Sequence, residues 1–118
     1  MGDVSKNFSR FEFACKDLCS FDVVDIELVT LLQILRDSFN RKVTIKSGCR
    51  CLTHNNRVGG SKQSQHLFGK AADIVMENIW PVTVYDYLDK RYPVSYGIGL
   101  YHTHVHIDIR RRKTRWGI

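Results

Sequence analysis

Residues Ser61 to Asp73 read S-K-Q-S-Q-H-L-F-G-K-A-A-D and lead from a polar loop into an apolar segment, A-A-D-I-V-M, typical of a buried strand. Asp73 lies inside that apolar segment, where a carboxylate needs a charged or hydrogen-bonding partner. His66 lies in the polar part, and Gly69 permits a tight backbone turn between the two. We therefore expect this stretch to deliver an imidazole and a carboxylate to one site.

A second stretch, Tyr101 to Ile109, reads Y-H-T-H-V-H-I-D-I and alternates polar with apolar residues over most of its length. In a β-strand this alternation places one set of side chains on a single face, namely His102, His104, His106 and Asp108. Taken singly, each histidine is more often an ordinary core or surface residue than a metal ligand. Two imidazoles and one carboxylate from distant segments would, however, leave one position open on a zinc ion, as in catalytic zinc sites.

The first stretch also matches a family pattern, Ser-x-His-x-x-Gly-x-Ala-x-Asp, at Ser64, His66, Gly69, Ala71 and Asp73. It resembles the signature of the zinc D-Ala-D-Ala carboxypeptidases and L-alanyl-D-glutamate endopeptidases. These enzymes belong to the fold group of lysostaphin, the D-Ala-D-Ala peptidases and the hedgehog signalling domain. The resemblance implies a hedgehog/D-Ala-D-Ala-peptidase-like α+β fold.

Three further segments resemble the same family and follow in the same order along the chain, from about Phe11 to Trp116. S-G-C-R at Ser47–Arg50 is similar to the family's S-G-Y-R. H-N-N-R-V-G-G at His54–Gly60 resembles the segment that leads into the zinc loop. His104-Val105-His106 resembles the His-x-His pair of the fold group.

Position by position, the resemblance implies three ligands for one zinc ion, His66, Asp73 and His106. Arg50 takes the place of an arginine that steadies the substrate carboxylate or the scissile carbonyl, and a guanidinium fork suits both tasks. Ser64 matches a serine near the substrate, although a loop-capping hydroxyl is an equally good interpretation of this residue.

The general base is where the sequence departs from the family. Many relatives carry an acid three residues before the last zinc histidine, but this chain has Thr103 there. A general base must take a proton from water and pass it to the leaving amine, which threonine cannot do. We therefore expect His104 to be the base, as in the His-x-His relatives. Asp108 would orient an imidazole from behind or act as the base itself, and His102 is less favoured.

These residues predict a zinc metallopeptidase that hydrolyses bacterial peptidoglycan, either as a D-Ala-D-Ala carboxypeptidase or as an L-Ala-D-Glu endopeptidase. The alternative is a catalytically inactive, zinc-containing binding module of the same fold. The N-terminus lacks the apolar centre of a signal peptide, which predicts synthesis in the cytoplasm and action on the cell wall after release. A phage endolysin fits this description, as does an enzyme of cell-wall processing.

Size and composition place few other demands on the chain. Its 118 residues suit one catalytic domain spanning 1–118, expected to be a monomer, and no apolar run is long enough to span a membrane. The net charge is +6, with a C-terminal cluster that favours a polyanion such as the bacterial envelope or forms a solvated tail. The cluster comprises Arg110, Arg111, Arg112, Lys113 and Arg115. Nucleic acid is not an expected partner, because no nucleic-acid-binding motif is present.

The four cysteines, Cys15, Cys19, Cys49 and Cys51, are spaced poorly for a structural zinc site. Synthesis in the cytosol favours free, buried thiols. One or two disulfides and a second metal site are the less favoured alternatives.

Apolar periodicity predicts an α+β domain in which a small antiparallel sheet packs with two or three helices. An aromatic-rich start, 1–21, is expected to form a lid or short helix. A helix over 24–39 is expected to be capped by Asp22 or Asp25 and to end at Asn40. A second helix is expected to begin at Pro81. Strands are predicted at 43–45, 71–76, 96–101 and 104–109, with a long loop at 47–65 that holds a helical turn near 53–57.

Overall fold

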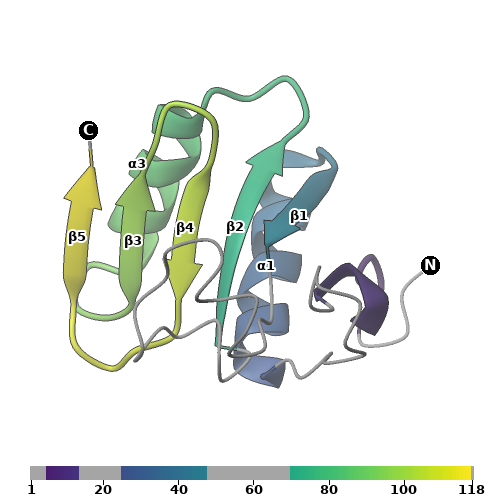
Figure 1. Ribbon diagram of the computed structural model, residues 1–118, viewed down its shortest axis with the longest axis horizontal. Helices are drawn as coiled ribbons and strands as arrows, with labels where there is room; N and C mark the ends of the chain where they lie inside the picture. The colour runs from purple at the N-terminus through teal and green to yellow at the C-terminus, as the bar shows by residue number, and fades with distance from the viewer. Residues whose placement is uncertain (1–4, 14–24, 48–69, 118) are drawn as a thin grey trace, which may run out of the picture.

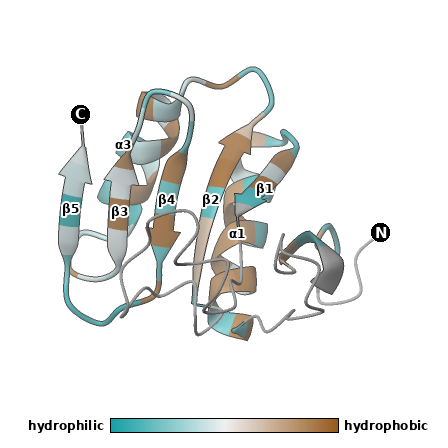
Figure 2. Ribbon diagram, viewed as in Figure 1, coloured by the Kyte–Doolittle hydropathy of each residue, from teal (hydrophilic) through white to brown (hydrophobic). Residues whose placement is uncertain are grey.

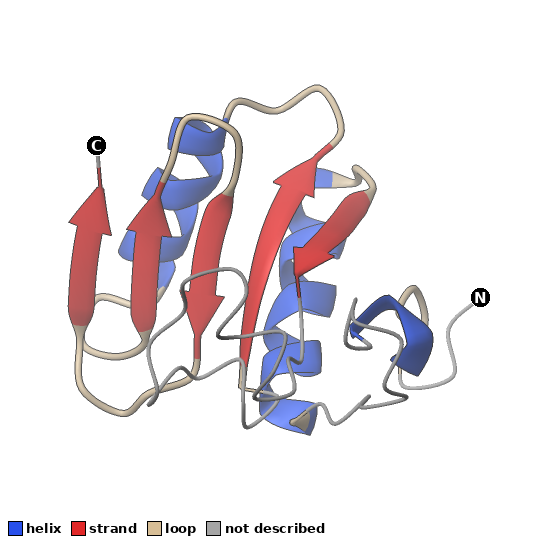
Figure 3. Ribbon diagram, viewed as in Figure 1, coloured by secondary structure: helices blue, strands red, loops and turns tan. Residues whose placement is uncertain are grey.

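The computed structural model describes residues 5–13, 25–47 and 70–117. They form a five-stranded sheet with two α-helices against one face (Figures 1 and 3). The strands are β1 (Val43–Ser47), β2 (Ala71–Met76), β3 (Gly97–Leu100), β4 (Val105–Asp108) and β5 (Thr114–Gly117), in the spatial order β1-β2-β4-β3-β5. The expected α+β class is confirmed.

The sheet is mixed. β1 with β2, β2 with β4 and β4 with β3 pair antiparallel, as the sequence predicted for a small antiparallel sheet. β5 pairs with β3 in parallel. It was not predicted as a strand, because its residues looked like part of a basic tail. After β4 the chain reverses direction, and β5 runs along the free edge of β3. Both β3 and β5 run opposite to β4, so they are parallel to each other.

Helix α1 (Ile26–Phe39) begins and ends where its capping residues predict. The Asp25 carboxylate accepts a hydrogen bond from the Glu27 N–H at 2.8 Å, and Asn40 adopts a left-handed conformation with φ of 51°. Ile26, the first residue of the helix, is 65% exposed. The first two residues of the helix lie at the edge of the core, and Leu28, Val29, Leu31, Leu32 and Leu35 are buried.

Helix α3 (Pro81–Arg91) starts with a proline, as predicted, and buries Val84 and Leu88 with Tyr87 partly covered. It packs against β2, β3 and β4. The core lies between the helices and the sheet, and the ribbon of β2 is largely hydrophobic (Figure 2). Phe13, the last residue of the short helix η1 (Arg10–Phe13), and Phe8, which precedes that helix, join this core.

Arg110 and Arg115 of the C-terminal cluster are part of the fold rather than of a solvated tail, Arg110 through an ion pair with Asp108 at 2.7 Å. Arg115 donates to the carboxylate of Asp89 at 2.7 Å and to the backbone carbonyl of Tyr96 at 2.7 Å. It also donates to the carbonyls of Tyr92 and Ser95. One guanidinium thus ties β5 to the end of α3 and to the segment that leads into β3. Of the remaining cations, Arg111, Arg112 and Lys113 are exposed.

Replacing Arg115 by methionine is expected to lower the free energy of unfolding by about 2–4 kcal/mol, because several carbonyls then lose their donor. Arg112→Met is the matched control. It removes an exposed arginine from the same segment and should change stability by no more than about 0.5 kcal/mol. Chemical denaturation measures both variants. Equal stabilities would show that the Arg115 contacts contribute nothing.

Some expectations fall outside the described residues. These are the four cysteines, Asp22, and the loop beyond Ser47 with its helical turn at 53–57. Their predicted states stay predictions. Within the described part of the chain, neither helix has the length and apolarity required to cross a membrane.

Candidate active site

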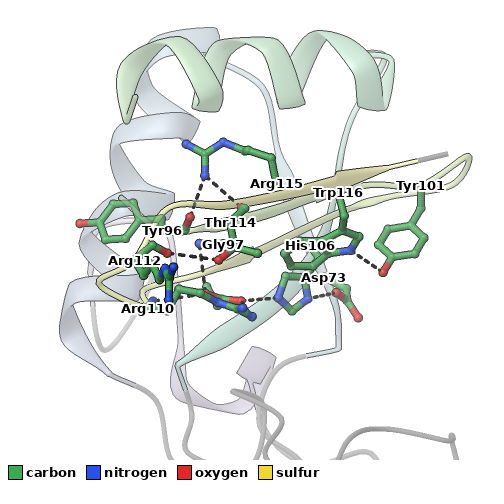
Figure 4. Close-up of polar contacts among 11 residues, drawn as sticks. Asp73, Tyr96, Gly97, Tyr101, His106, Arg110, Arg112, Thr114, Arg115 and Trp116 are labelled. Carbon is green, nitrogen blue, oxygen red and sulfur yellow. Dashed lines mark hydrogen bonds and ion pairs between the residues drawn. The ribbon is translucent and has the colours of Figure 1, made fainter. Parts of the chain in front are cut away.

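One row of residues crosses the sheet from strand to strand and defines the site. Asp73 on β2 is directly opposite His106 on β4, and His106 is opposite Gly99 on β3. Gly99 in turn pairs with Trp116 on β5. Directly opposed residues share a face of a sheet. Since Val105 and Ile107 are buried in the core, His106 and this row belong to the face away from the helices (Figure 4).

His106 is held between two carboxylates (Figure 4). Its Nε2 lies 2.8 Å from Asp108 Oδ2, and its Nδ1 lies 3.0 Å from Asp73 Oδ1. An ionised carboxylate only accepts hydrogen bonds, so Nε2 carries a proton and donates it to Asp108. In the neutral ring this fixes the tautomer, with Nδ1 as the unprotonated nitrogen that faces Asp73, whereas in the imidazolium both nitrogens donate.

Asp108 is fully buried, at 0% exposure, and its two oxygens are saturated with donors. Arg110 forms a bidentate ion pair with the carboxylate of Asp108, in which Nε donates to Oδ1 and Nη2 donates to Oδ2, each at 2.7 Å. The backbone N–H groups of Gly97 and Arg110 donate to Oδ1 at 3.2 Å. A buried charge this well paired is stable in place, and it gives His106 a rigid anchor.

The pKa values follow from these contacts. Burial alone would raise the pKa of Asp108, but hydrogen bonds from His106 and Arg110 hold that pKa well below its usual range. Burial alone would lower the pKa of His106, but the hydrogen bonds and charges of Asp108 and Asp73 outweigh it, so the pKa of His106 is raised. The hydrogen bond to Asp108 raises the pKa of Arg110. The site therefore favours positive charge at His106.

The geometry of the His106–Asp73 pair tests whether a metal fits. With Nε2 protonated, a neutral His106 would point the Nδ1 lone pair at a carboxylate oxygen 3.0 Å away. Two acceptors at this distance require a cation that both contact, either a proton on Nδ1 or a metal ion. An imidazole nitrogen with a carboxylate oxygen is a donor set that zinc accepts. The carboxylate behind the imidazole is a usual second-shell partner of a metal-bound histidine. The residues fit a zinc ion.

Two glycines of β3 make room for this arrangement. A Cβ on Gly97 would lie 2.5 Å from Asp108 Oδ1 and 2.6 Å from Arg110 Nε, and a Cβ on Gly99 would overlap the indole of Trp116. Side chains at these two positions would occupy the space above β3 that Asp108, Arg110 and Trp116 now fill. Sequence reasoning missed this role, although glycine inside a strand is a known sign of close approach by another group.

Gly97→Ala is expected to displace the Asp108–Arg110 pair, lowering the free energy of unfolding by about 1–3 kcal/mol. Zinc affinity should fall roughly tenfold, because the anchor of His106 moves. Gly117→Ala is the control, since its Cβ would meet Leu100 Cβ at 3.1 Å, a milder contact. Thermal melts and a zinc titration distinguish the two variants. Wild-type behaviour of Gly97→Ala would show that the close approach has no consequence.

Two further histidines of the described residues, His102 and His104, lie in the turn that joins β3 and β4. His104 is partly buried, its Nδ1 lies 3.0 Å from Thr103 Oγ1, and its ring stacks on Tyr101 with centroids 4.5 Å apart. It precedes Val105, so alternation places it on the same face as His106. His102 is exposed at the tip and contributes to a cavity of about 260 Å³ beside Trp80.

Three predicted site residues, Arg50, Ser64 and His66, lie outside the described residues. Their roles stay predictions. Within the described ranges, no group of three or more His, Cys, Asp or Glu residues is arranged to hold a metal. Of the three predicted ligands, Asp73 and His106 lie within the described residues and face each other on adjacent strands, and their role as ligands stays a prediction.

Comparison with known proteins identifies the family. A zinc D-Ala-D-Ala carboxypeptidase of Streptomyces albus G is 42% identical to this chain over 50 residues, which are 40% of this chain and 20% of that protein. The match therefore spans only a fifth of that relative's length. A family model described as Peptidase M15 matches residues 6–108, which include Asp73, His104, His106 and Asp108. The chain belongs to the Peptidase M15 family.

Proposed function

We propose that this chain is a zinc-dependent peptidase that hydrolyses peptide bonds of bacterial peptidoglycan. The zinc ligands in this proposal are His66, Asp73 and His106. Membership of Peptidase M15 supports peptidase chemistry, and the named zinc carboxypeptidase relative supports both the metal and the D-alanyl class of substrate.

One observation carries the proposal. Nδ1 of His106 and Oδ1 of Asp73 lie 3.0 Å apart on adjacent strands, and the other ring nitrogen is anchored to Asp108. A salt bridge alone would require only one carboxylate beside the imidazole. A second carboxylate, backed by an arginine, fixes the tautomer that a metal-bound histidine requires.

Zinc bound at this site would polarise the scissile carbonyl and lower the pKa of a bound water toward about 7. The protein must still move a proton from the attacking water to the leaving amine. We assign this task to Nε2 of His104. If Thr103 Oγ1 accepts the Nδ1–H of His104, the lone pair lies on Nε2, and stacking on Tyr101 fixes the plane of the ring. Thr103, although no base itself, thereby orients one.

The contacts of Asp108 support the orienting role over that of a base. Both of its oxygens accept from Arg110 at 2.7 Å, one also accepts from His106, and the carboxylate is fully buried. A carboxylate with a strongly lowered pKa and no exposure is a poor proton acceptor. Arg50 and Ser64 are assigned to substrate binding from the resemblance alone, as is His66 to the metal.

Purified protein incubated with bacterial peptidoglycan, with and without a chelator, tests the proposal. We expect chelator-sensitive release of fragments, read by mass spectrometry. Loss of D-Ala would identify a carboxypeptidase, and stem peptides beginning at D-Glu would identify an L-Ala-D-Glu endopeptidase. His104→Ala should keep the zinc but lose cleavage, which separates the base from the ligands.

Two outcomes would contradict the proposal. Zinc bound without cleavage of any bond would favour the inactive binding module. Cleavage that survives complete removal of metal would exclude zinc catalysis. A lytic role in a phage and action after release from the cytoplasm stay predictions from the sequence.

A further inference from the structure

We infer that Trp116 is a positioning residue of this site, which holds the ring of His106 by direct contact and the ring of His104 through Tyr101. The inference rests on the proposed function. Trp116 lies outside the region that the family model matches, residues 6–108. It also has no counterpart among the site residues that the sequence predicted.

Trp116 directly contacts His106 and Arg110, the two residues that are hydrogen-bonded to Asp108 from opposite sides. The Trp116 ring lies 5.1 Å from the His106 ring, tilted by 48°, and the guanidinium of Arg110 lies 5.4 Å from the indole centroid. The indole of Trp116 therefore contacts both the imidazole of His106 and the guanidinium of Arg110, which is paired with Asp108. An aromatic ring next to imidazole and guanidinium restricts rotation of both and contributes attraction to the cation.

The position of the indole depends on Gly99. Trp116 and Gly99 are paired across β5 and β3, and a Cβ on Gly99 would overlap the indole. The indole thus lies across β3 toward His106. Any side chain at position 99 would overlap the indole and exclude it from this place. Trp116 is on the face away from the helices and is only partly buried. Filling the hydrophobic core is therefore not its role.

The indirect contact runs through Tyr101. Nε1 of Trp116 donates to the Tyr101 hydroxyl at 2.9 Å (Figure 4). The Tyr101 ring stacks on His104 with centroids 4.5 Å apart and planes 12° apart. Tyr101 is also tied to His104 along the backbone, its N–H donating to the His104 carbonyl at 3.0 Å. The indole N–H thus fixes the orientation of the Tyr101 ring, on which the ring of His104, the candidate base, is stacked.

The two contacts predict separable effects. Trp116→Phe keeps an aromatic ring beside His106 but loses the N–H, and Tyr101→Phe loses only the hydroxyl that accepts it. Both should retain zinc affinity and lower kcat roughly tenfold with KM little changed. The double variant should be no worse than either single variant, because each removes the same hydrogen bond. Trp116→Ala removes the ring contact too and should also weaken zinc binding roughly tenfold.

Zinc affinity, measured by competition with a chromophoric chelator, gives a readout that does not depend on activity. Trp80→Phe provides a matched control and a spectroscopic background. Trp80 is 79% exposed, and with Trp116 it makes up the two tryptophans of the chain. The Trp80→Phe protein should bind zinc like the wild type, and zinc should change the emission of its remaining indole. Circular dichroism establishes that each variant is folded. If Trp116→Ala fails to fold, the kcat values of Trp116→Phe and Tyr101→Phe and the emission change still test the positioning role of Trp116.

The failures are distinguishable. A wild-type protein that binds no zinc would overturn the proposed function and, with it, this inference. Zinc binding by the wild type with unchanged affinity in Trp116→Ala and unchanged kcat in Trp116→Phe would overturn the positioning role alone. Additive losses in the Trp116→Phe/Tyr101→Phe double variant would also overturn it.

Discussion

His106→Ala is expected to abolish one-to-one zinc binding and, with it, all cleavage of peptidoglycan. The substitution removes the nitrogen that faces Asp73 at 3.0 Å, leaving at most two of three proposed ligands. Loss of an outer partner of a ligand already weakens metal binding 10–100-fold, so loss of the ligand itself should exceed about 100-fold. The fold should survive, because Asp108 keeps both hydrogen bonds from Arg110.

The matched control is His102→Ala, which removes an exposed histidine from the same turn. Zinc content by mass spectrometry and competition affinity should be unchanged in this variant. One zinc ion per chain in His106→Ala would place the metal elsewhere, with the four cysteines as the first alternative.

Asp108→Asn is expected to damage both the fold and the site. The amide matches the carboxylate in shape, but its NH2 group would meet a donor wherever it points, since both oxygens accept from Arg110. The Arg110 guanidinium would also lose its counter-charge, although at 36% exposure solvent screens it in part. With a buried hydrogen-bond network broken on the Asp108 side, the free energy of unfolding should fall by about 2–3 kcal/mol. His106 would lose the negatively charged acceptor that favours a proton on its Nε2, so zinc affinity should fall about 10–100-fold.

The stability that Asp108 contributes also predicts a pH dependence. Its pKa is lowered in the folded state. The contribution is therefore fully present above the unfolded carboxyl pKa of about 3.9 and is lost as pH falls toward the lower folded value. Metal-free wild type should lose more stability on acidification below about pH 4 than Asp108→Asn does.

Asp86→Asn is the matched control, because Asp86 is an exposed acid on α3. It should retain stability, zinc affinity and the acid response of the wild type. Denaturant melts across the acidic range measure all three proteins. An Asp108→Asn protein with wild-type stability and zinc affinity would show that the buried carboxylate anchors nothing.

Much of the fold could be predicted from local patterns. Asp25, Asn40 and Pro81 mark helix ends through interactions within one or two turns, and β2 follows from one apolar run. β5 could not be predicted in this way, because its residues T-R-W-G look like part of a basic tail. It becomes a strand through long-range contacts, the pairing with β3 and the Arg115 contacts to the end of α3.

The same division holds for the site. Alternation in Y-H-T-H-V-H-I-D-I predicted that His104, His106 and Asp108 share a face, since this periodicity is a property of the extended backbone itself. The family pattern singled out Asp73. The sequence by itself thus determined which groups carry the proposed chemistry.

Only the tertiary structure decided how those groups are anchored. The pairing of β2, β4, β3 and β5 aligns Asp73, His106, Gly99 and Trp116 in one row and brings Gly97 opposite Asp108. Strand order and register are set by core packing over the whole sheet rather than by any local run of residues. For this reason the roles of Gly97, Gly99, Arg110 and Trp116 emerge only once the strands are assembled.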